Sequence, residues 1–223
     1  LNAIPLETVL NHPDARRVTS DVNRETIERR SFSPRRIKVF ARPYTCLHPA
    51  PEYRFSVNRE ARRVLPDLVD NPVQRIVPED HPEKNVSASF ALRRNIGVVF
   101  SGGPAPGGHN VIAGLYDEMR RYHPESRLYG FLDGPDGIIE SRYLEITPSL
   151  VDTYRNLGGF SMIKTGRTKI DSRQKMDAAL KTCLDLKLEA LVVIGGDDSN
   201  TNAAFLAQHF KIHGIQVVGV PKT

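Results

Sequence analysis

Two adjacent carboxylates, Asp197 and Asp198, carry much of the chemical information in this chain. They follow Gly195-Gly196, directly after the apolar run at residues 190–194. Two acids beside an anion site repel the ligand unless a cation offsets them, and Mg²⁺ does so by bridging carboxylate and phosphate oxygens. Either acid taken singly would also suit the cap of a helix that begins there. The pair behind two glycines favours a magnesium-dependent site for phosphate groups.

A second loop, at residues 101–110, joins an apolar run to a helical pattern and reads Ser-Gly-Gly-Pro-Ala-Pro-Gly-Gly-His-Asn. Glycines such as Gly102 and Gly103 let backbone N–H groups approach an anion closely, and the N-terminus of the following helix adds partial positive charge. A phosphate group is the expected ligand, although the same glycines would also serve a tight turn. The spacing is neither that of a Walker A loop nor that of the dinucleotide fingerprint.

The last residues, Pro221-Lys222-Thr223, follow another apolar run. A lysine at the end of a strand can supply positive charge to a phosphoryl group during its transfer. Taken without its context, a residue such as Lys222 is more often an ordinary surface lysine. Its interest comes from the two loops described above, which the same fold would bring close to it.

The elements that must position these loops are strands and helices in alternation. Apolar strands without polar alternation, separated by helices, predict a parallel sheet with helices on both faces, which is a Rossmann-like, three-layer α/β fold. Ligands bind beyond the carboxyl ends of such strands, where the loops at Ser101, Gly195 and Pro221 fall. The patterns predict strands at residues 95–100, 127–131, 190–194 and 215–220, helices at 111–122, 148–156, 172–186 and 202–210, and a loop at 133–137.

The first 94 residues differ in composition from the rest. They contain no glycine but 10 of the 16 prolines, and their 17 Lys and Arg against 12 Asp and Glu account for the whole net charge of +5. We therefore divide the chain into a Pro-rich, partly helical N-terminal extension, residues 1–94, and an α/β domain, residues 95–223, that is incomplete at its C-terminus. Within the extension we expect short helices at 21–30 and 58–69 and extended linkers at 34–51 and 72–82.

Composition also limits the partners and the location. Acidic residues lie among the arginines of the extension and no nucleic-acid motif accompanies them, so a solvated or intersubunit surface is favoured over nucleic-acid binding. No apolar run approaches the roughly 20 residues that span a bilayer, and the start of the chain has no secretory pattern. Cys46 and Cys183 match no metal or redox spacing, which favours two reduced thiols in a cytoplasmic protein.

The motifs of the second half resemble the phosphofructokinase family, in the same order and spacing. Residues 97–110 resemble its opening strand and first phosphate loop. Gly158-Gly159-Phe160 with Gly166-Arg167-Thr168 resemble its next motif, and residues 195–199 and Pro221-Lys222-Thr223 resemble the last two. The resemblance implies the family's fold, its Mg²⁺ dependence and the transfer of a phosphoryl group to the 1-hydroxyl of fructose 6-phosphate, in reversible, glycolytic chemistry.

Two residues indicate the branch of the family. Its ATP-dependent members typically carry glycine where Asp198 and Lys222 stand, so the resemblance implies the pyrophosphate-dependent branch. There Asp198 blocks the position of the nucleotide's α-phosphate, since a carboxylate beside a third phosphate costs Coulomb energy and fills the space that glycine leaves. Lys222 binds pyrophosphate and stabilises the transition state, and we count both residues as catalytic.

The resemblance also implies roles for the remaining site residues. Asp197 contacts Mg²⁺, and Thr223 begins the segment that contacts fructose 6-phosphate. Pyrophosphate is expected to contact four residues, which are Gly102, Gly103, Arg167 and Lys222. The front segment resembles the extensions of the long pyrophosphate-dependent members, but less closely. A homo-oligomer with no nucleic-acid or membrane partner is expected.

The family continues after Pro-Lys-Thr with an Ile-Asp-Gly-Asp segment, whose first Asp is the general base for the sugar hydroxyl. This chain stops at Thr223, so we expect it to be the front part of a longer polypeptide and to need the remainder for activity. Three alternatives remain open at this point: an ATP-dependent phosphofructokinase, a relative of the NAD and lipid kinases, and a non-catalytic regulatory subunit. Asp198 and Lys222 speak against the first, the loop at 101–110 against the second, and the retained acid pair against the third.

Overall fold

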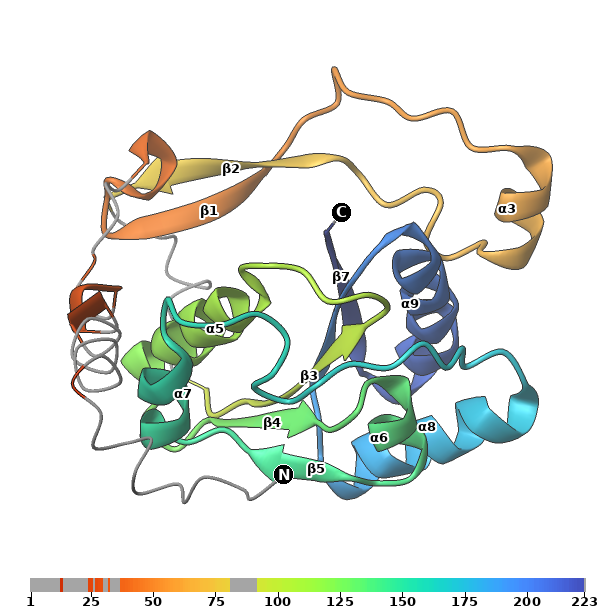
Figure 1. Ribbon diagram of the computed structural model, residues 1–223. Coiled ribbons are helices and arrows are strands. Elements are labelled where there is room, and N and C mark those ends of the chain that lie inside the picture. The colour runs from red at the N-terminus through yellow and green to blue at the C-terminus, as the bar shows by residue number, and fades with distance from the viewer. Residues whose placement is uncertain are drawn as a thin grey trace, which may run out of the picture.

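The computed structural model describes residues 37–80 and 92–222, together with a few positions between residues 13 and 32. Strands and helices alternate through the second half of the chain (Figure 1). Its strands are β3 (Asn95–Ser101), β4 (Arg127–Phe131), β5 (Tyr143–Glu145), β6 (Ala190–Gly195) and β7 (Gln216–Pro221). Its helices are α5 (Gly108–Tyr122), α6 (Pro135–Ile139), α7 (Pro148–Tyr154), α8 (Arg173–Asp185) and α9 (Asp197–Phe210), followed by the 3-10 turn η2 (Lys211–His213).

The five strands form one sheet in the order β5-β4-β3-β6-β7. The pairs β3–β4, β3–β6 and β6–β7 are parallel, which confirms the sheet expected from the apolar runs. β5 pairs antiparallel with β4 at one edge, and sequence reasoning did not predict it. Its three residues are exposed or half-buried, so they show none of the apolar character that marked the other strands.

The core consists of two clusters on opposite faces of the sheet. Neighbouring residues of β3 alternate between them, since Val98 packs in the cluster with α5 and α7, and Val99 in the cluster with α8 and α9. Both of these side chains are fully buried. The strand therefore needs apolar residues at every position, and the expected three-layer fold with helices on both faces is confirmed.

Two helices begin earlier than their apolar periodicity suggested, α5 at Gly108 rather than at residue 111 and α9 at Asp197, and one helix, α6, was not predicted. α9 begins at Asp197, five residues before the predicted start, because Gly196 takes the cap position and the polar residues after it form the first turn. α6 begins at Pro135, inside the segment predicted as a loop at 133–137, so that prediction is wrong for residues 135–137. Proline suits the first turn of a helix, where its missing N–H has no partner to lose.

The described part of the front segment forms a separate two-stranded sheet. β1 (Tyr44–Pro49) and β2 (Gln74–Glu79) pair antiparallel, so these two stretches of the linkers predicted at 34–51 and 72–82 are corrected here to paired strands. Both strands contain proline, yet a two-stranded ribbon leaves one edge of each strand free of ladder bonds and tolerates it. The short element η1 (Lys38–Phe40) precedes β1, α3 (Arg59–Val64) lies in the connection between β1 and β2, and the expected helix at 21–30 lies mostly outside the described residues.

The described residues of this front segment contact the α/β part at several places, among them the Asn156 amide, which donates to the Arg29 and Phe32 carbonyls at 3.1 and 3.3 Å. The side chain of Gln208, near the end of α9, donates to the Asp67 carboxylate at 2.6 Å and accepts from the Asp67 N–H at 3.1 Å. Arg121, at the end of α5, donates to the Pro43 carbonyl at 3.4 Å. In Figure 1, accordingly, α3 lies beside α9 and the ribbon lies above α5. Within the described residues, no helix is both long and apolar enough to cross a bilayer.

Candidate functional site

A cavity of about 380 Å³ lies at the carboxyl edge of the parallel sheet. The ends of three strands meet there, because Ser101 pairs with Gly195 and Gly195 pairs with Pro221. The fold thus brings together the three loops that the sequence singled out, as the geometry of parallel sheets predicts. The lining residues are Ser101, Gly102, Gly103, Arg167, Thr168, Lys169, Gly196, Asp197, Asp198, Ser199, Asn202 and Lys222.

The first loop is tied to the segment that carries Arg167. Gly102 has a φ of +88°, which favours glycine, and its N–H donates to the Gly166 carbonyl at 2.8 Å. The Thr165 hydroxyl donates back to the Gly102 carbonyl at 2.8 Å. Two hydrogen bonds therefore hold the glycine loop and the Arg167 segment side by side along one wall of the cavity.

The second loop places both acids in the first turn of α9. Gly196 is the cap residue, and the Asp198 N–H donates to the Asp197 carboxylate at 2.9 Å. Gly195 has no room for a side chain, because a Cβ there would overlap Ser199 and approach the Ser101 carbonyl oxygen at 2.7 Å. The Asn200 amide donates to the carbonyls of Gly195 and Gly196 at 2.7 and 2.8 Å. These contacts fix the N-terminus of α9, with its partial positive charge, at the cavity.

Lys222 reaches back across the cavity to the first loop. Its Nζ donates to the Gly103 carbonyl at 2.6 Å, and its backbone N–H donates to the Gly195 carbonyl at 2.9 Å. Its ammonium group also lies 5.8 Å from the centre of the Phe160 ring. Lys222 is half-buried and lines the cavity, in contrast to an ordinary surface lysine.

Arg167 and Lys222 flank Gly103 together. A Cβ built on Gly103 would lie 3.6 Å from Arg167 Nη2 and 4.0 Å from Lys222 Nζ. Any larger residue at this position would therefore take up space between the two cations. The arrangement leaves two positive groups next to an open backbone segment, which suits an anion with several oxygens.

Lys169 is a site residue that sequence reasoning missed. Its Nζ lies 3.4 Å from Asp198 Oδ2, and both side chains are well exposed, Asp198 at 80%. An ion pair this exposed contributes little stability, so its carboxylate and ammonium group remain available to a ligand. The sequence feature that could have identified Lys169 is its position directly after the Gly166-Arg167-Thr168 motif. With Lys169, the cavity has three cations against the two carboxylates.

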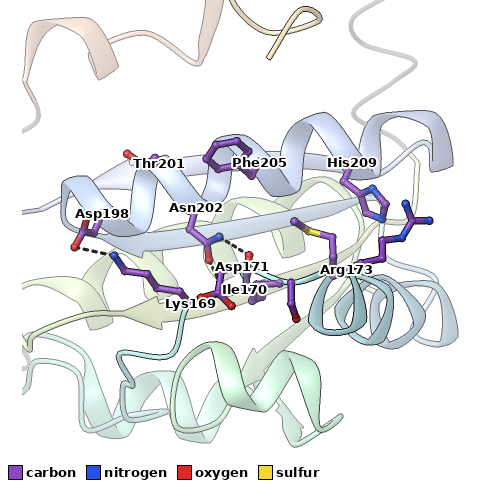
Figure 2. Close-up of a pocket in the computed structure, with 11 residues that line it drawn as sticks. Lys169, Ile170, Asp171, Arg173, Asp198, Thr201, Asn202, Phe205 and His209 are labelled. Atoms are coloured by element: carbon purple, nitrogen blue, oxygen red, sulfur yellow. Dashed lines mark hydrogen bonds and ion pairs between the residues drawn. The ribbon is translucent and has the colours of Figure 1, made fainter. Parts of the chain in front are cut away.

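A second pocket, of about 510 Å³, adjoins this cavity between α8 and α9. Figure 2 shows the Lys169–Asp198 pair at one end of this pocket and His209 at the other. The Asn202 side chain connects α9 to the segment at Ile170. The Asn202 amide donates to the Ile170 carbonyl at 2.8 Å, and the Asn202 side-chain carbonyl accepts from the Ile170 N–H at 3.1 Å (Figure 2). Asp198 and Lys169 line both pockets and so stand at the border between them.

The acid pair suits a metal ion that arrives with its substrate. Among the residues that the structure describes, no group of three or more His, Cys, Asp or Glu side chains could hold a metal by itself. Mg²⁺, however, is usually bound through one or two carboxylates together with substrate phosphates and water. Asp197 and Asp198 on the cavity wall fit that manner of binding. Thr223, the expected contact to the sugar phosphate, lies outside the described residues.

These features define a class, the doubly wound α/β proteins with a glycine-rich, charged cavity at the carboxyl edge of a parallel sheet. Within that class, the chain belongs to the phosphofructokinase family, because the family's sequence model, described as Phosphofructokinase, matches residues 95–223. The resemblance inferred from the sequence motifs is thereby confirmed.

Similar proteins carry more specific names. The chain is 58% identical over 131 residues to pyrophosphate--fructose 6-phosphate 1-phosphotransferase of Porphyromonas gingivalis, which covers 58% of this chain and 24% of that protein. It is 53% identical over 147 residues to the protein of the same name from Treponema pallidum, covering 65% of this chain and 25% of the relative. Subunit beta 2 of the Arabidopsis thaliana enzyme is 41% identical over 216 residues, or 96% of this chain and 37% of the relative.

The chain therefore spans only about a quarter to somewhat more than a third of the length of these relatives. The Arabidopsis match extends over most of the front segment as well as the α/β part. Two solved structures, of pyrophosphate-dependent phosphofructokinases from Marinobacter aquaeolei and Nitrosospira multiformis, have TM-scores of 0.51 and 0.52 at 17% and 19% identity. Each match covers 58% of this chain, and 33% and 34% of those chains respectively, and supports the fold.

Proposed function

We propose that the full-length protein transfers a phosphoryl group from pyrophosphate to the 1-hydroxyl of fructose 6-phosphate, giving fructose 1,6-bisphosphate. The observation that carries this proposal is that Lys222 and Asp198 line the same cavity. Lys222 brings positive charge to the first glycine loop, and Asp198 stands where the cavity opens toward the neighbouring pocket. The names of two similar proteins, at 58% and 53% identity, support the same reaction.

Pyrophosphate would lie between the first glycine loop and the start of α9. Its oxygens would be bound by the backbone at Gly102 and Gly103, the Arg167 guanidinium and the Lys222 ammonium group. A planar guanidinium and a compact ammonium group are both common phosphate ligands in proteins. As charge shifts to the phosphate that leaves, Lys222 would stabilise it from a fixed position, which is the main way in which phosphoryl transfer is catalysed. Phosphate, the product, would fit the same cradle, and for that reason we propose that the reaction is reversible.

Mg²⁺ fits this site as a companion of the substrate. Asp197, in the first turn of α9, would contact the ion, and the bound ion would neutralise phosphate charge and orient the pyrophosphate. Asp198 would exclude a third phosphate by charge and by volume, so that ATP binds poorly. Both assignments rest on the position of the acids at the wall of the cavity.

The acceptor side involves parts of the protein outside the described residues. We assign Thr223 to the contact with fructose 6-phosphate. The general base for the 1-hydroxyl of that sugar is assigned to the part of the relatives' sequences that this chain does not cover. The remainder of the same polypeptide is therefore a proposed partner of residues 1–223. Plant relatives are named as alpha and beta subunits, which supports assembly into an oligomer, and we propose a homo-oligomer that works in cytoplasmic glycolysis.

A donor comparison tests the proposal. The purified full-length enzyme is assayed with fructose 6-phosphate and Mg²⁺, once with pyrophosphate and once with ATP, by coupling fructose 1,6-bisphosphate formation to NADH oxidation. We expect turnover with pyrophosphate and little or none with ATP, and loss of turnover when Mg²⁺ is chelated. Faster turnover with ATP would refute the proposed donor, and full activity without a divalent ion would refute the role of Asp197.

A further inference from the structure

Beneath Lys222 lies a buried aromatic ring that does not line the cavity. The Lys222 ammonium group is 5.8 Å from the centroid of the Phe160 ring, within the range of a cation–π interaction. We propose that Phe160 is a positioning residue, whose ring face holds the Lys222 ammonium group over the pyrophosphate cavity. This inference rests on the proposed function, in which Lys222 binds pyrophosphate.

The ring is held rigidly from below. Phe160 stacks on Phe100 of β3 with ring centroids 4.1 Å apart and planes only 3° from parallel. Phe160 is 4% exposed and Phe100 is fully buried. At Gly108, the first residue of α5, an added Cβ would overlap the Phe160 ring and approach Phe100 at 2.9 Å. A glycine is thus required where the helix and the ring meet, and the ring is held between this close contact and the stacked Phe100 ring.

The loop that carries the ring is also fixed. The Gly158 N–H donates to Nε2 of His109 at 3.4 Å, and His109 is only 4% exposed. Burial lowers the pKa of His109, so its imidazole stays neutral and keeps an acceptor nitrogen. Gly159 packs near the Ala105 carbonyl oxygen, 3.2 Å from where its Cβ would be. The loop from Gly158 to Phe160 is therefore attached to the first phosphate loop and to the start of α5.

An aromatic face suits this task better than a carboxylate would. The ammonium group of lysine has three donors and no acceptor. One donor of Lys222 is used by the Gly103 carbonyl, so two remain for oxygens of a ligand. A carboxylate in the place of the ring would take up a donor and neutralise the charge that the ligand needs. The ring attracts the ammonium group by its quadrupole and leaves both the charge and the two donors in place.

Fluorination of the ring separates this attraction from packing. In the full-length enzyme, 3,4,5-trifluorophenylalanine is placed at position 160, which weakens the quadrupole while nearly keeping the size of the ring. We expect kcat/KM for pyrophosphate to fall about 2- to 30-fold, the range of a lost cation–π contact, with little change in the KM for fructose 6-phosphate. The same residue placed at Phe131, fully buried in the other core cluster, is the matched control and should leave the kinetics unchanged.

Phe160→Leu removes the ring altogether but also opens the core, so it serves only as a second variant, expected to lose at least as much kcat/KM. A second measurement does not depend on turnover. It is the rate at which an amine-reactive reagent acetylates Lys222, measured by peptide mass spectrometry relative to the exposed Lys187. Fluorination at 160 should raise the labelling of Lys222 about twofold or more, as the ammonium group becomes freer.

The outcomes separate this inference from the proposed function. Unchanged kinetics and unchanged labelling on fluorination at position 160 would overturn the role of Phe160, even if the wild-type enzyme uses pyrophosphate well. Equal losses on fluorination at 160 and at 131 would also overturn it, because they would show a general effect on folding. If the wild type fails to use pyrophosphate, the proposed function fails, and the labelling experiment still decides whether Phe160 holds Lys222.

Discussion

Lys222 and Asp198 carry opposite charges and opposite proposed tasks at one cavity. Lys222 is half-buried and anchored to the Gly103 carbonyl, whereas Asp198 is well exposed and forms an ion pair with the exposed side chain of Lys169. The first geometry fits a preorganised charge that acts on a bound ligand. The second fits a barrier at the border of two pockets, which acts on ligands too long for the cavity.

Replacing Lys222 tests the preorganised charge. Lys222→Met in the full-length enzyme removes the ammonium group and keeps a side chain of similar length. We expect kcat with pyrophosphate to fall about 10²- to 10³-fold, as for other fixed donors to a transition-state charge. Lys187→Met, at an exposed lysine far along the chain, should retain wild-type turnover. Steady-state kinetics of both variants decide the matter, and a Lys222→Met enzyme within about threefold of wild type would contradict the assignment.

Two substitutions at Asp198 separate charge from volume. Asp198→Gly removes both, so we expect pyrophosphate use to weaken and ATP binding to improve. Asp198→Asn keeps the volume and removes the charge, and should improve ATP binding less than the glycine variant does. Competition by ATP against pyrophosphate, measured as an inhibition constant in each variant, reports the effect. If neither variant changes ATP binding or turnover, Asp198 is not the barrier.

At the scale of the elements, Asn200 joins helix α9 to the strands that end at the cavity. Its amide donates to the carbonyls of Gly195 and Gly196, and Gly219 of β7 approaches it so closely that a Cβ there would overlap its side chain. The strand-end glycines therefore serve the packing of this side chain as well as the open backbone of the cavity. An asparagine in the first turn of a helix would otherwise be read only as a capping residue.

Asn200→Ala is expected to destabilise the fold rather than only the site. Two hydrogen bonds in a tightly packed position are lost, so the free energy of unfolding should fall by about 1–3 kcal/mol. Thr201→Ala, at the next and exposed position of α9, should change it by less than about 0.5 kcal/mol. Urea unfolding of the full-length variants, followed by circular dichroism, gives both values. Equal stabilities of the two variants would mean that the Asn200 bonds contribute nothing.

At the scale of the whole molecule, the reactivity of the two thiols depends on how tightly each half of the chain is packed around its cysteine. Neither forms a disulfide among the described residues, and Cys183 is fully buried on the core face of α8, whereas Cys46 is half-buried on the β1–β2 ribbon. Burial raises the pKa of Cys183 to about 12, so the reactive thiolate is almost absent near neutral pH. The ribbon has no comparable core around its cysteine.

Cys46 should therefore be alkylated by iodoacetamide at pH 8, while Cys183 should react at least about 10²-fold more slowly. Raising the pH from 8 to 10 should increase the rate at Cys183 about tenfold per pH unit without reaching a plateau, because the thiolate fraction keeps rising below a pKa of about 12. Peptide mass spectrometry over a time course distinguishes the two sites, and a fully denatured sample in which both react equally is the control. Equal rates in the native protein would contradict the packing of α8.

Sequence by itself determined the parallel sheet, the three loops at its carboxyl edge and the family. Continuous apolar strands such as residues 190–194 and local glycine patterns such as residues 101–110 are encoded in neighbouring residues, and the strand ends of a parallel sheet must meet. The prediction for the front segment was wrong because its strands depend on distant contacts. β1 and β2 lie some 25 residues apart in the chain and pair through contacts that no local pattern shows. The antiparallel strand β5 was missed likewise.

Tertiary structure alone decided which side chains meet at the cavity. Lys169 reaches Asp198 from a segment about 30 residues earlier, and Phe160 lies under Lys222 although some 60 residues separate them. Neither pairing follows from residue type or spacing, because a lysine and a phenylalanine are compatible with many neighbours. The place of the Phe160 ring under Lys222 follows from its close packing against Gly108 and Phe100.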